Sequence, residues 1–132
     1  MARLTDEMKE LFLEQKMYSV ATSSKSGIPN VVPIARVKLL DDETILLCDQ
    51  YMNKTITNLR ENPVASISIW RPKLGFQFKG TAEILESGKI YEETAAWLNE
   101  VKPGAKLKSA VILRITEIFN CSPGAAAGAR IE

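Results

Sequence analysis

The chain has 132 residues, of which 45% are hydrophobic and 25% are charged, and this composition is typical of one soluble globular domain spanning residues 1–132. Its 17 basic and 16 acidic residues leave a net charge of +1, without the basic excess that nucleic-acid-binding domains usually carry. Histidine is absent, which excludes histidine-based catalytic triads and histidine-ligated zinc or haem.

An amphipathic helix is predicted near the N-terminus. Apolar residues recur there at helical spacing from Met8 to Phe12, and Thr5 or Asp6 can serve as the N-cap. The segment MYSVATSS that follows is a β-type run ending in the turn KSGIP. The chain therefore opens with a helix that leads into a strand.

The segment NVVPIARVKLL is predicted as one strand. Its odd positions from Val31 to Leu39 are apolar and its even positions are mixed, which indicates a single inner face. Pro33 cannot donate a hydrogen bond to a neighbouring strand, so it marks an edge, a bulge or an opening of the sheet.

Four further strands and two helices are predicted along the rest of the chain. The turn DDE leads into the strand TILLCD, and residues 53–62 read as a short helix ended by Pro63. VASISIWR and GFQFKGTAEIL are the next two strands, and alternate positions from Phe76 to Ile84 share one face. SGKIYEETAAWLNEV is a helix with Ser87 as its cap, KPGAK breaks it, and SAVILRITEIF is the sixth strand.

The order of these elements predicts the fold class. The strands follow one another mostly as antiparallel neighbours, without regular alternation of strand and helix. We therefore expect a mainly β protein of the α+β class, a six-stranded antiparallel β-barrel whose openings are covered by helices.

The start of the helix over 53–62 is the most informative site. A helix dipole disfavours a lysine in the first turn, so Lys54 needs either solvent or an anion. Asn53 is a good N-cap, and the free N–H groups, the Thr55 hydroxyl and the ammonium would together surround a phosphate with donors. However, an exposed lysine there costs only about a few tenths of a kcal/mol, and the chain has neither a P-loop nor GxGxxG. The residues alone leave both interpretations open.

The ordered combination of segments resembles the pyridoxamine 5'-phosphate oxidase-like FMN-binding split barrels. TILLCDQYMNKTITNLRENPVASISI is similar to the family segment in which a strand ends, a Lys-Thr or Arg-Lys pair grips the FMN phosphate, and a helix ends before the next strand. NVVPIARVKLLDDE and FQFKGTAEIL resemble the strands before and after it. The likeness runs from about Leu4 to Phe119 and is nearest in length to the small FMN-binding and flavoredoxin-like members.

The resemblance implies a set of cofactor-binding residues. Lys54 and Thr55 would hold the phosphate, with Asn53 beside them. Asp49 and Gln50 would line the ribityl chain. The flavin ring would pass along the backbone of one short segment, which comprises Val32, Pro33 and Ile34.

Departures from the family pattern limit the function that the resemblance implies. Asn53 stands where the oxidases often have another arginine, and Met52 stands where serine is common. The tail SPGAAAG lacks the histidine and arginine with which the oxidases bind pyridoxamine. We expect an FMN-dependent oxidoreductase or electron carrier, with no assigned catalytic residue and no pyridoxamine phosphate oxidase activity, because the flavin ring itself carries the redox chemistry.

The resemblance also implies a homodimer with two flavins at the interface, served by a small-molecule or protein redox partner. Trp70, Phe76 and Trp97 can reach such an interface or can be ordinary core aromatics. Two alternatives stay open on the same fold. One is a deazaflavin-dependent reductase, with haem as a weaker ligand option, and the other is a cofactor-free binding module.

Other features predict a cytoplasmic protein without metal. The N-terminus MARLTDEMKE lacks the apolar core of a signal peptide, and no apolar run approaches the ~20 residues of a membrane span. Cys48 and Cys121 form no CxxC pair and are interpreted as buried reduced thiols. The acidic run 41–43 is a turn without partner ligands for a metal.

Overall fold

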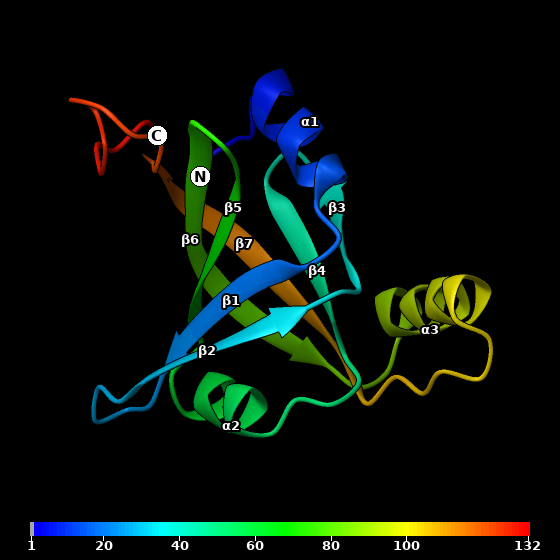
Figure 1. Cartoon of the computed structure of the whole chain (residues 1–132). Coiled ribbons are helices and arrows are strands. Elements are labelled where there is room, and N and C mark those ends of the chain that lie inside the picture. The colour runs from blue at the N-terminus through cyan, green and yellow to red at the C-terminus, as the bar shows by residue number, and fades with distance from the viewer. Residues whose placement is uncertain (1) are drawn as a thin grey trace.

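The computed structural model describes residues 2–132, and within them the chain forms seven strands and three helices (Figure 1). In chain order these are α1 (Asp6–Glu14), β1 (Tyr18–Ser23), β2 (Pro29–Ile34), β3 (Val37–Asp41), β4 (Thr44–Asp49), α2 (Lys54–Glu61), β5 (Val64–Arg71), β6 (Leu74–Leu85), α3 (Lys89–Val101) and β7 (Ser109–Asn120). The mainly β class with covering helices is confirmed, and the number of strands differs by one from the six expected.

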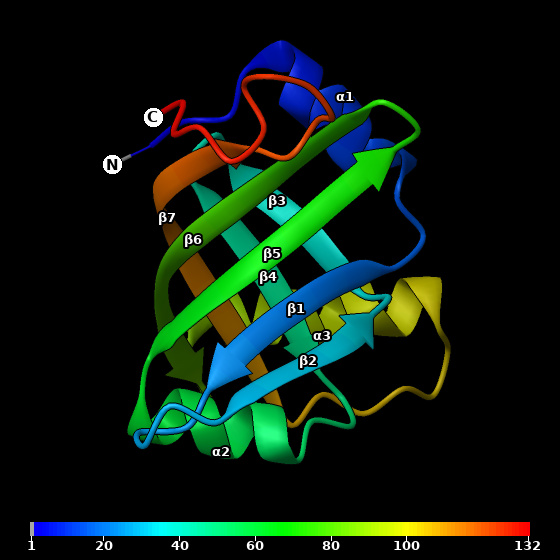
Figure 2. The same ribbon diagram turned by 60° about the vertical axis from the view of Figure 1, so that its left-hand side comes forward.

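All seven strands join one antiparallel sheet in the order β2-β1-β5-β6-β7-β4-β3. The sheet curls strongly, as the two views of the ribbon show (Figures 1 and 2). α2 closes one end of the curled sheet and α1 lies at the opposite end (Figure 2). This arrangement is a split barrel, in which β2 and β3 are the two edge strands.

The additional strand comes from the segment NVVPIARVKLL, which was expected to be one strand. The chain leaves β2, which pairs with β1, and turns at Ala35 and Arg36 into β3, which pairs with β4. The Arg36 carbonyl accepts a hydrogen bond from the backbone N–H of Cys48 at 3.0 Å, so the turn is tied to the second edge of the sheet. The single inner face was also wrong, because Val31 is 65% exposed and its even-numbered neighbour Val32 packs against the core.

The main core fills the inside of the curled sheet. Alternate residues of each strand point inward, so that Val20, Ile67 and Phe78 are all completely buried. Burial of a side chain of this size contributes roughly 1.5–3 kcal/mol. β4 is buried along its whole length, because its inward side chains join the main core and Leu46 joins a second cluster beside α3 with Ala110.

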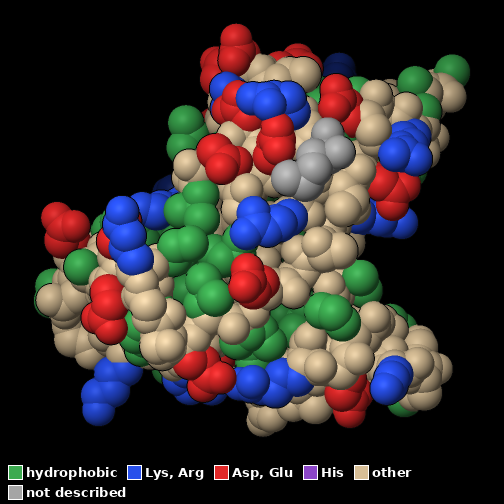
Figure 3. Space-filling model, turned by 180° about the vertical axis from the view of Figure 1, so that it is seen from behind, with side chains coloured by type: hydrophobic (Ala, Val, Ile, Leu, Met, Phe, Trp, Pro, Cys, Tyr) green, Lys and Arg blue, Asp and Glu red, His purple; other side chains and the backbone are tan. Residues whose placement is uncertain are grey.

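α3 covers the outer face of the sheet next to β7 (Figure 1). Seen from behind, hydrophobic side chains gather in the hollow between this helix and the sheet (Figure 3). The expected cap at Ser87 was wrong: the N-cap is Gly88, whose φ of 95° suits glycine, and it makes no side-chain hydrogen bond. None of the helices within residues 2–132 is both long enough and apolar enough to cross a membrane.

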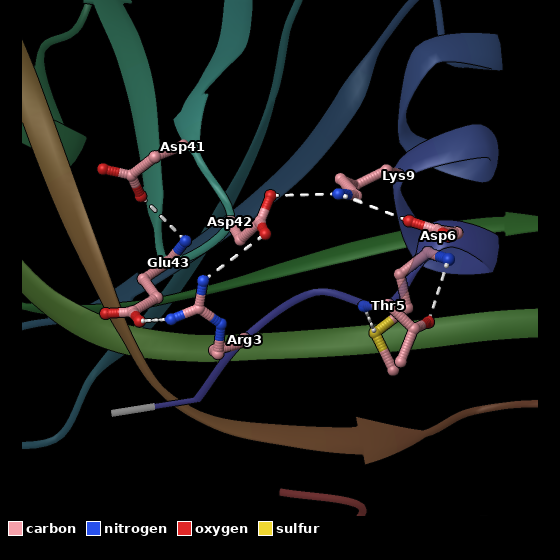
Figure 4. Close-up of polar contacts among 8 residues, drawn as sticks. Arg3, Thr5, Asp6, Lys9, Asp41, Asp42 and Glu43 are labelled. Atoms are coloured by element: carbon pink, nitrogen blue, oxygen red, sulfur yellow. Dashed lines mark hydrogen bonds and ion pairs between the residues drawn. The ribbon is translucent and has the colours of Figure 1, made fainter.

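α1 is fixed to the β3–β4 turn by charged side chains (Figure 4). The Thr5 hydroxyl accepts a hydrogen bond from the Met8 N–H at 3.3 Å, which confirms Thr5 as the N-cap. Lys9 donates to the Asp42 carboxylate at 3.0 Å, and this hydrogen bond lowers the pKa of Asp42. Arg3 contacts the same carboxylate at 3.5 Å, so the segment before α1 and the helix itself converge on one turn.

Candidate functional site

The first turn of α2 leaves its donors open. Lys54 is the first helical residue and is exposed, and the first turn contains no acidic residue. The expected N-cap hydrogen bond is absent among the described residues, because the Asn53 side chain makes none. The backbone N–H groups at the start of an α-helix have no partner within the helix, so this end presents positive charge and unpaired donors.

A buried polar network holds α2 against the β1–β2 hairpin. The Asn30 amide donates to the hydroxyls of Thr22 at 3.2 Å and Thr55 at 3.1 Å. The Asn58 amide donates to the same Thr22 hydroxyl at 3.1 Å. Sequence reasoning did not identify Asn30, Thr22 or Asn58, although Thr22 stands out as a polar residue that continues the inward alternation of Tyr18 and Val20. The network fixes the direction in which the helix start points.

A cleft of about 390 Å³ lies at this helix start. One wall is formed by the end of β2 and the turn into β3, and the other by residues 50–55. Seven of the eight residues expected at a cofactor site line this cleft together: Val32, Pro33, Ile34, Gln50, Asn53, Lys54 and Thr55. These residues come from two segments of the chain, the end of β2 and the segment that leads into α2, and α2 packs against β2.

Asp49, the eighth expected residue, does not line the cleft. Its side chain is 3% exposed and accepts hydrogen bonds from the Met52 N–H at 3.1 Å and the Ser109 hydroxyl at 3.0 Å. Lys108 approaches the same carboxylate at 3.8 Å and donates to the Met52 carbonyl at 3.0 Å. The carboxylate thus holds the loop that carries residues 50–53 into α2.

Comparison with known proteins places this fold in a family. Residues 4–122 match the family model described as pyridoxamine 5'-phosphate oxidase. The chain belongs to this family. It is 39% identical over 129 residues to an uncharacterized protein of Methanocaldococcus jannaschii, with 96% of this chain and 86% of that protein covered.

Two solved structures illustrate the range of the likeness. HupZ of Group A Streptococcus has a TM-score of 0.83 and 34% identity, covering 95% of this chain and 99% of the HupZ chain. An FMN-binding protein of Syntrophomonas wolfei has a TM-score of 0.77, covering 88% of this chain and 84% of the other. Its identity is 17%, so this second match shows the shared fold alone.

In this family member the cleft is positively charged. Arg36, Lys54 and Lys102 line it, and no acidic side chain of residues 2–132 does. Lys102 reaches across from the end of α3 and donates to the Tyr51 hydroxyl at 3.2 Å. Sequence reasoning did not place Lys102 at the site, because a lysine that follows a helix carries no signal of what the loop approaches. The excess of cationic side chains favours an anionic ligand.

The cleft contains one thiol, that of Cys48. Burial raises the pKa of Cys48 to about 11, so the group is a neutral thiol near pH 7 and a poor nucleophile. Cys121, by contrast, is exposed, which corrects the expectation that both thiols are buried. Within the described residues no group of three or more histidine, cysteine or acidic side chains is arranged to hold a metal ion.

Proposed function

We propose that this protein binds FMN in the cleft at the start of α2 and acts as a flavin-dependent oxidoreductase or electron carrier. The observation that carries the proposal is the uncapped first turn of α2, where Lys54 and free backbone donors face a cleft without acidic side chains. A dianionic phosphate satisfies such donors and is stabilised by the helix dipole. A cleft of about 390 Å³ falls in the size range of ligand sites.

The walls of the cleft suggest how the rest of the cofactor would be held. Lys54, Thr55 and Asn53 would hold the phosphate, and Gln50 would lie beside the ribityl chain. β2 is an edge strand of the sheet, so one side of its backbone has no strand partner among residues 2–132. Unpaired N–H and C=O groups at such an edge can bond a ligand, which suits the polar edge of a flavin ring passing residues 32–34.

Bound FMN would supply the hydride or electron transfer. The chain's own residues would bind and orient the ring, and we assign none of them a catalytic role. Asp49 would act as a positioning residue, since its buried carboxylate fixes the loop before the phosphate site. We do not propose pyridoxamine phosphate oxidase activity.

We further propose that two copies associate over this region. Large apolar side chains in and beside the β1–β2 hairpin are exposed in the single chain: Met17, which lines the cleft, is 53% exposed, and Ile28 and Val31 are 66% and 65% exposed. Contiguous exposed apolar surface usually marks an interaction site. Of the aromatic residues expected to reach an interface, Trp70 is 56% exposed, whereas Phe76 is buried in the core.

A flavin titration tests the proposal. Quenching of FMN fluorescence on addition of the purified protein, together with a rise in melting temperature at saturating FMN, is the expected result. Lys54→Ala removes a charge-assisted contact and should weaken FMN binding by about 10- to 100-fold. Lys89→Ala is a matched control, because Lys89 is the first residue of α3 as Lys54 is of α2, and it should leave the affinity unchanged.

Two other outcomes would contradict FMN as the ligand. Binding of a deazaflavin coenzyme without binding of FMN would assign the cleft to a deazaflavin-dependent reductase. Equal melting temperatures with and without both cofactors would indicate a cofactor-free module, because a ligand that binds only the folded state must stabilise it. Analytical ultracentrifugation tests the dimer separately, and a monomer at micromolar concentration would contradict it.

A further inference from the structure

A second cleft adjoins the first on the side of the loop between α3 and β7. Its volume is about 490 Å³, and residues 102–106 and Lys108 form one wall. Gln50, Tyr51 and Lys102 line both clefts, so the two clefts are direct neighbours. We call this second cleft the lysine pocket, defined by Tyr51, Lys102, Lys106 and Lys108 together with the loop backbone.

The lysine pocket concentrates positive charge beyond what one flavin phosphate would neutralise. Three lysines line it, and no carboxylate of the described chain does. Across both clefts the cationic residues number five: Arg36, Lys54, Lys102, Lys106 and Lys108. The whole chain has 17 basic and 16 acidic residues, so the charges are segregated toward this region. Concentrated charge of one sign in adjoining clefts attracts ligands of the opposite sign.

The three lysines of the lysine pocket differ in the contacts that they already make within the protein. Lys108 is engaged by Asp49 and the Met52 carbonyl. Lys102 contacts the neutral partners Gln50 and Tyr51 at 3.5 and 3.2 Å. Among residues 2–132, carboxylates form ion pairs with Lys9, Lys89 and Lys108, and with neither Lys102 nor Lys106. Lys102 and Lys106 therefore retain charge that a ligand can neutralise.

The pocket also offers an aromatic surface. Tyr51 stands at the boundary of the two clefts and is 81% exposed. The Lys102 ammonium lies 5.1 Å from the centre of its ring, which is a cation–π distance. A planar base can stack on an exposed aromatic ring while neighbouring lysines contact phosphate, which is the pairing of groups that single-stranded nucleic-acid-binding proteins use.

The loop is held in place by its own hydrogen bonds. The Lys108 N–H donates to the Asp49 carbonyl at 2.8 Å, and the Ala105 N–H donates to the Lys102 carbonyl at 3.0 Å. The Gly104 N–H donates to the Asn99 side chain at 3.0 Å, and the φ of Gly104 is 84°, a value that favours glycine. A preorganised loop loses little entropy when a ligand binds.

We infer that the lysine pocket binds the phosphate-bearing part of a second nucleotide, an adenosine diphosphate group, beside the flavin cleft. That the lysine pocket lies beside a redox cofactor rests on the proposed function, whereas the affinity of the pocket for a nucleotide does not. The diphosphate contacts Lys102 and Lys106, and the base packs on the face of the Tyr51 ring that the Lys102 ammonium does not cover. The group belongs either to a separate nucleotide cosubstrate or to the adenylate half of a flavin dinucleotide, since both present the same chemistry.

Isothermal titration of the full chain with ADP tests this inference, with adenosine as the probe that lacks phosphate. We expect ADP to bind, and we expect adenosine to bind at least about tenfold more weakly than ADP. Lys106→Glu should weaken the binding of ADP by about tenfold or more. Lys25→Glu makes the same change of charge in the β1–β2 turn, away from both clefts, and should leave ADP binding unchanged. Failure of ADP to bind, or equal effects of the two variants, would overturn the inference.

The same titrations separate the two sources of the group and the two proposals. Binding of ADP to the FMN-loaded protein, with FAD no tighter than FMN, indicates a separate nucleotide. FAD binding tighter than FMN, with ADP competing against FAD and not against FMN, indicates one dinucleotide. ADP that displaces FMN itself would overturn the second site. ADP binding without any FMN binding would instead overturn the proposed flavin function and leave the lysine pocket in place.

Discussion

Replacement of Asp49 by alanine should destabilise the protein strongly, although the residue is the last of a strand and precedes a loop. The change removes the acceptor for two buried donors, the Met52 N–H and the Ser109 hydroxyl. Each buried donor left without a partner costs about 1–3 kcal/mol. The Lys108 contact adds little, because that side chain is 53% exposed and the pair is 3.8 Å apart.

The expected loss in the free energy of unfolding is therefore about 2–6 kcal/mol. Urea unfolding followed by tryptophan fluorescence measures it, with the m value compared between variants. Asp41→Ala is the matched control. Asp41 also ends a strand and accepts one backbone N–H, that of Glu43 at 2.8 Å, but it is exposed. Equal losses for Asp41→Ala and Asp49→Ala, or a loss below about 1 kcal/mol for Asp49→Ala, would refute the reasoning.

Three further predictions concern stability and thiol chemistry. Gly80→Ala should lower the free energy of unfolding in urea by about 1–3 kcal/mol or more, because the new Cβ would lie 2.3 Å from a backbone oxygen of β7. Gly75→Ala should lower it less, because its new Cβ would meet its nearest atoms at 3.3 Å. Ellman's reagent should react with Cys121 alone in the folded protein, because Cys48 is buried and burial raises its pKa to about 11. After unfolding, both thiols should react. Two reactive thiols in the folded protein would contradict this prediction. The pKa of Asp42 lies below its ordinary value of 3.8, so the stabilising contribution of this carboxylate is present above pH 3.8 and is lost as the pH falls through the lower folded-state value. Asp42→Asn should therefore flatten the acid side of the stability–pH curve. An unchanged slope in the variant would contradict a stabilising role for the Asp42 charge.

Local patterns in the sequence predicted most of the individual elements. The alternation from Phe76 onward set the inward face of β6, and Pro63 marked the end of α2. The break between β2 and β3 could not be predicted in this way, because the apolar alternation continues through Ala35 and Arg36. The break depends on which edge of the sheet each half joins, and that is decided by pairing with β1 and β4.

The same contrast holds at the site: residues placed by their own segment could be predicted from the sequence, and those placed by contacts with distant segments could not. The donors at Lys54 and Thr55 follow from their place at a helix start, so sequence reasoning could assemble them. The burial of Asp49 depends on Ser109, which is 60 residues away, and the contribution of Lys102 depends on how the loop after α3 returns to the sheet. Neither relationship leaves a periodic or spacing signal in one sequence.

The most direct test of the phosphate site compares FMN with riboflavin, because the two differ only in the phosphate. We predict that the wild-type protein binds FMN about 100-fold more tightly than riboflavin, and that Lys54→Ala removes most of this difference while leaving riboflavin affinity unchanged. Riboflavin affinity equal to that of FMN in the wild-type protein, or an equal loss for both ligands in the variant, would contradict a phosphate held at the start of α2.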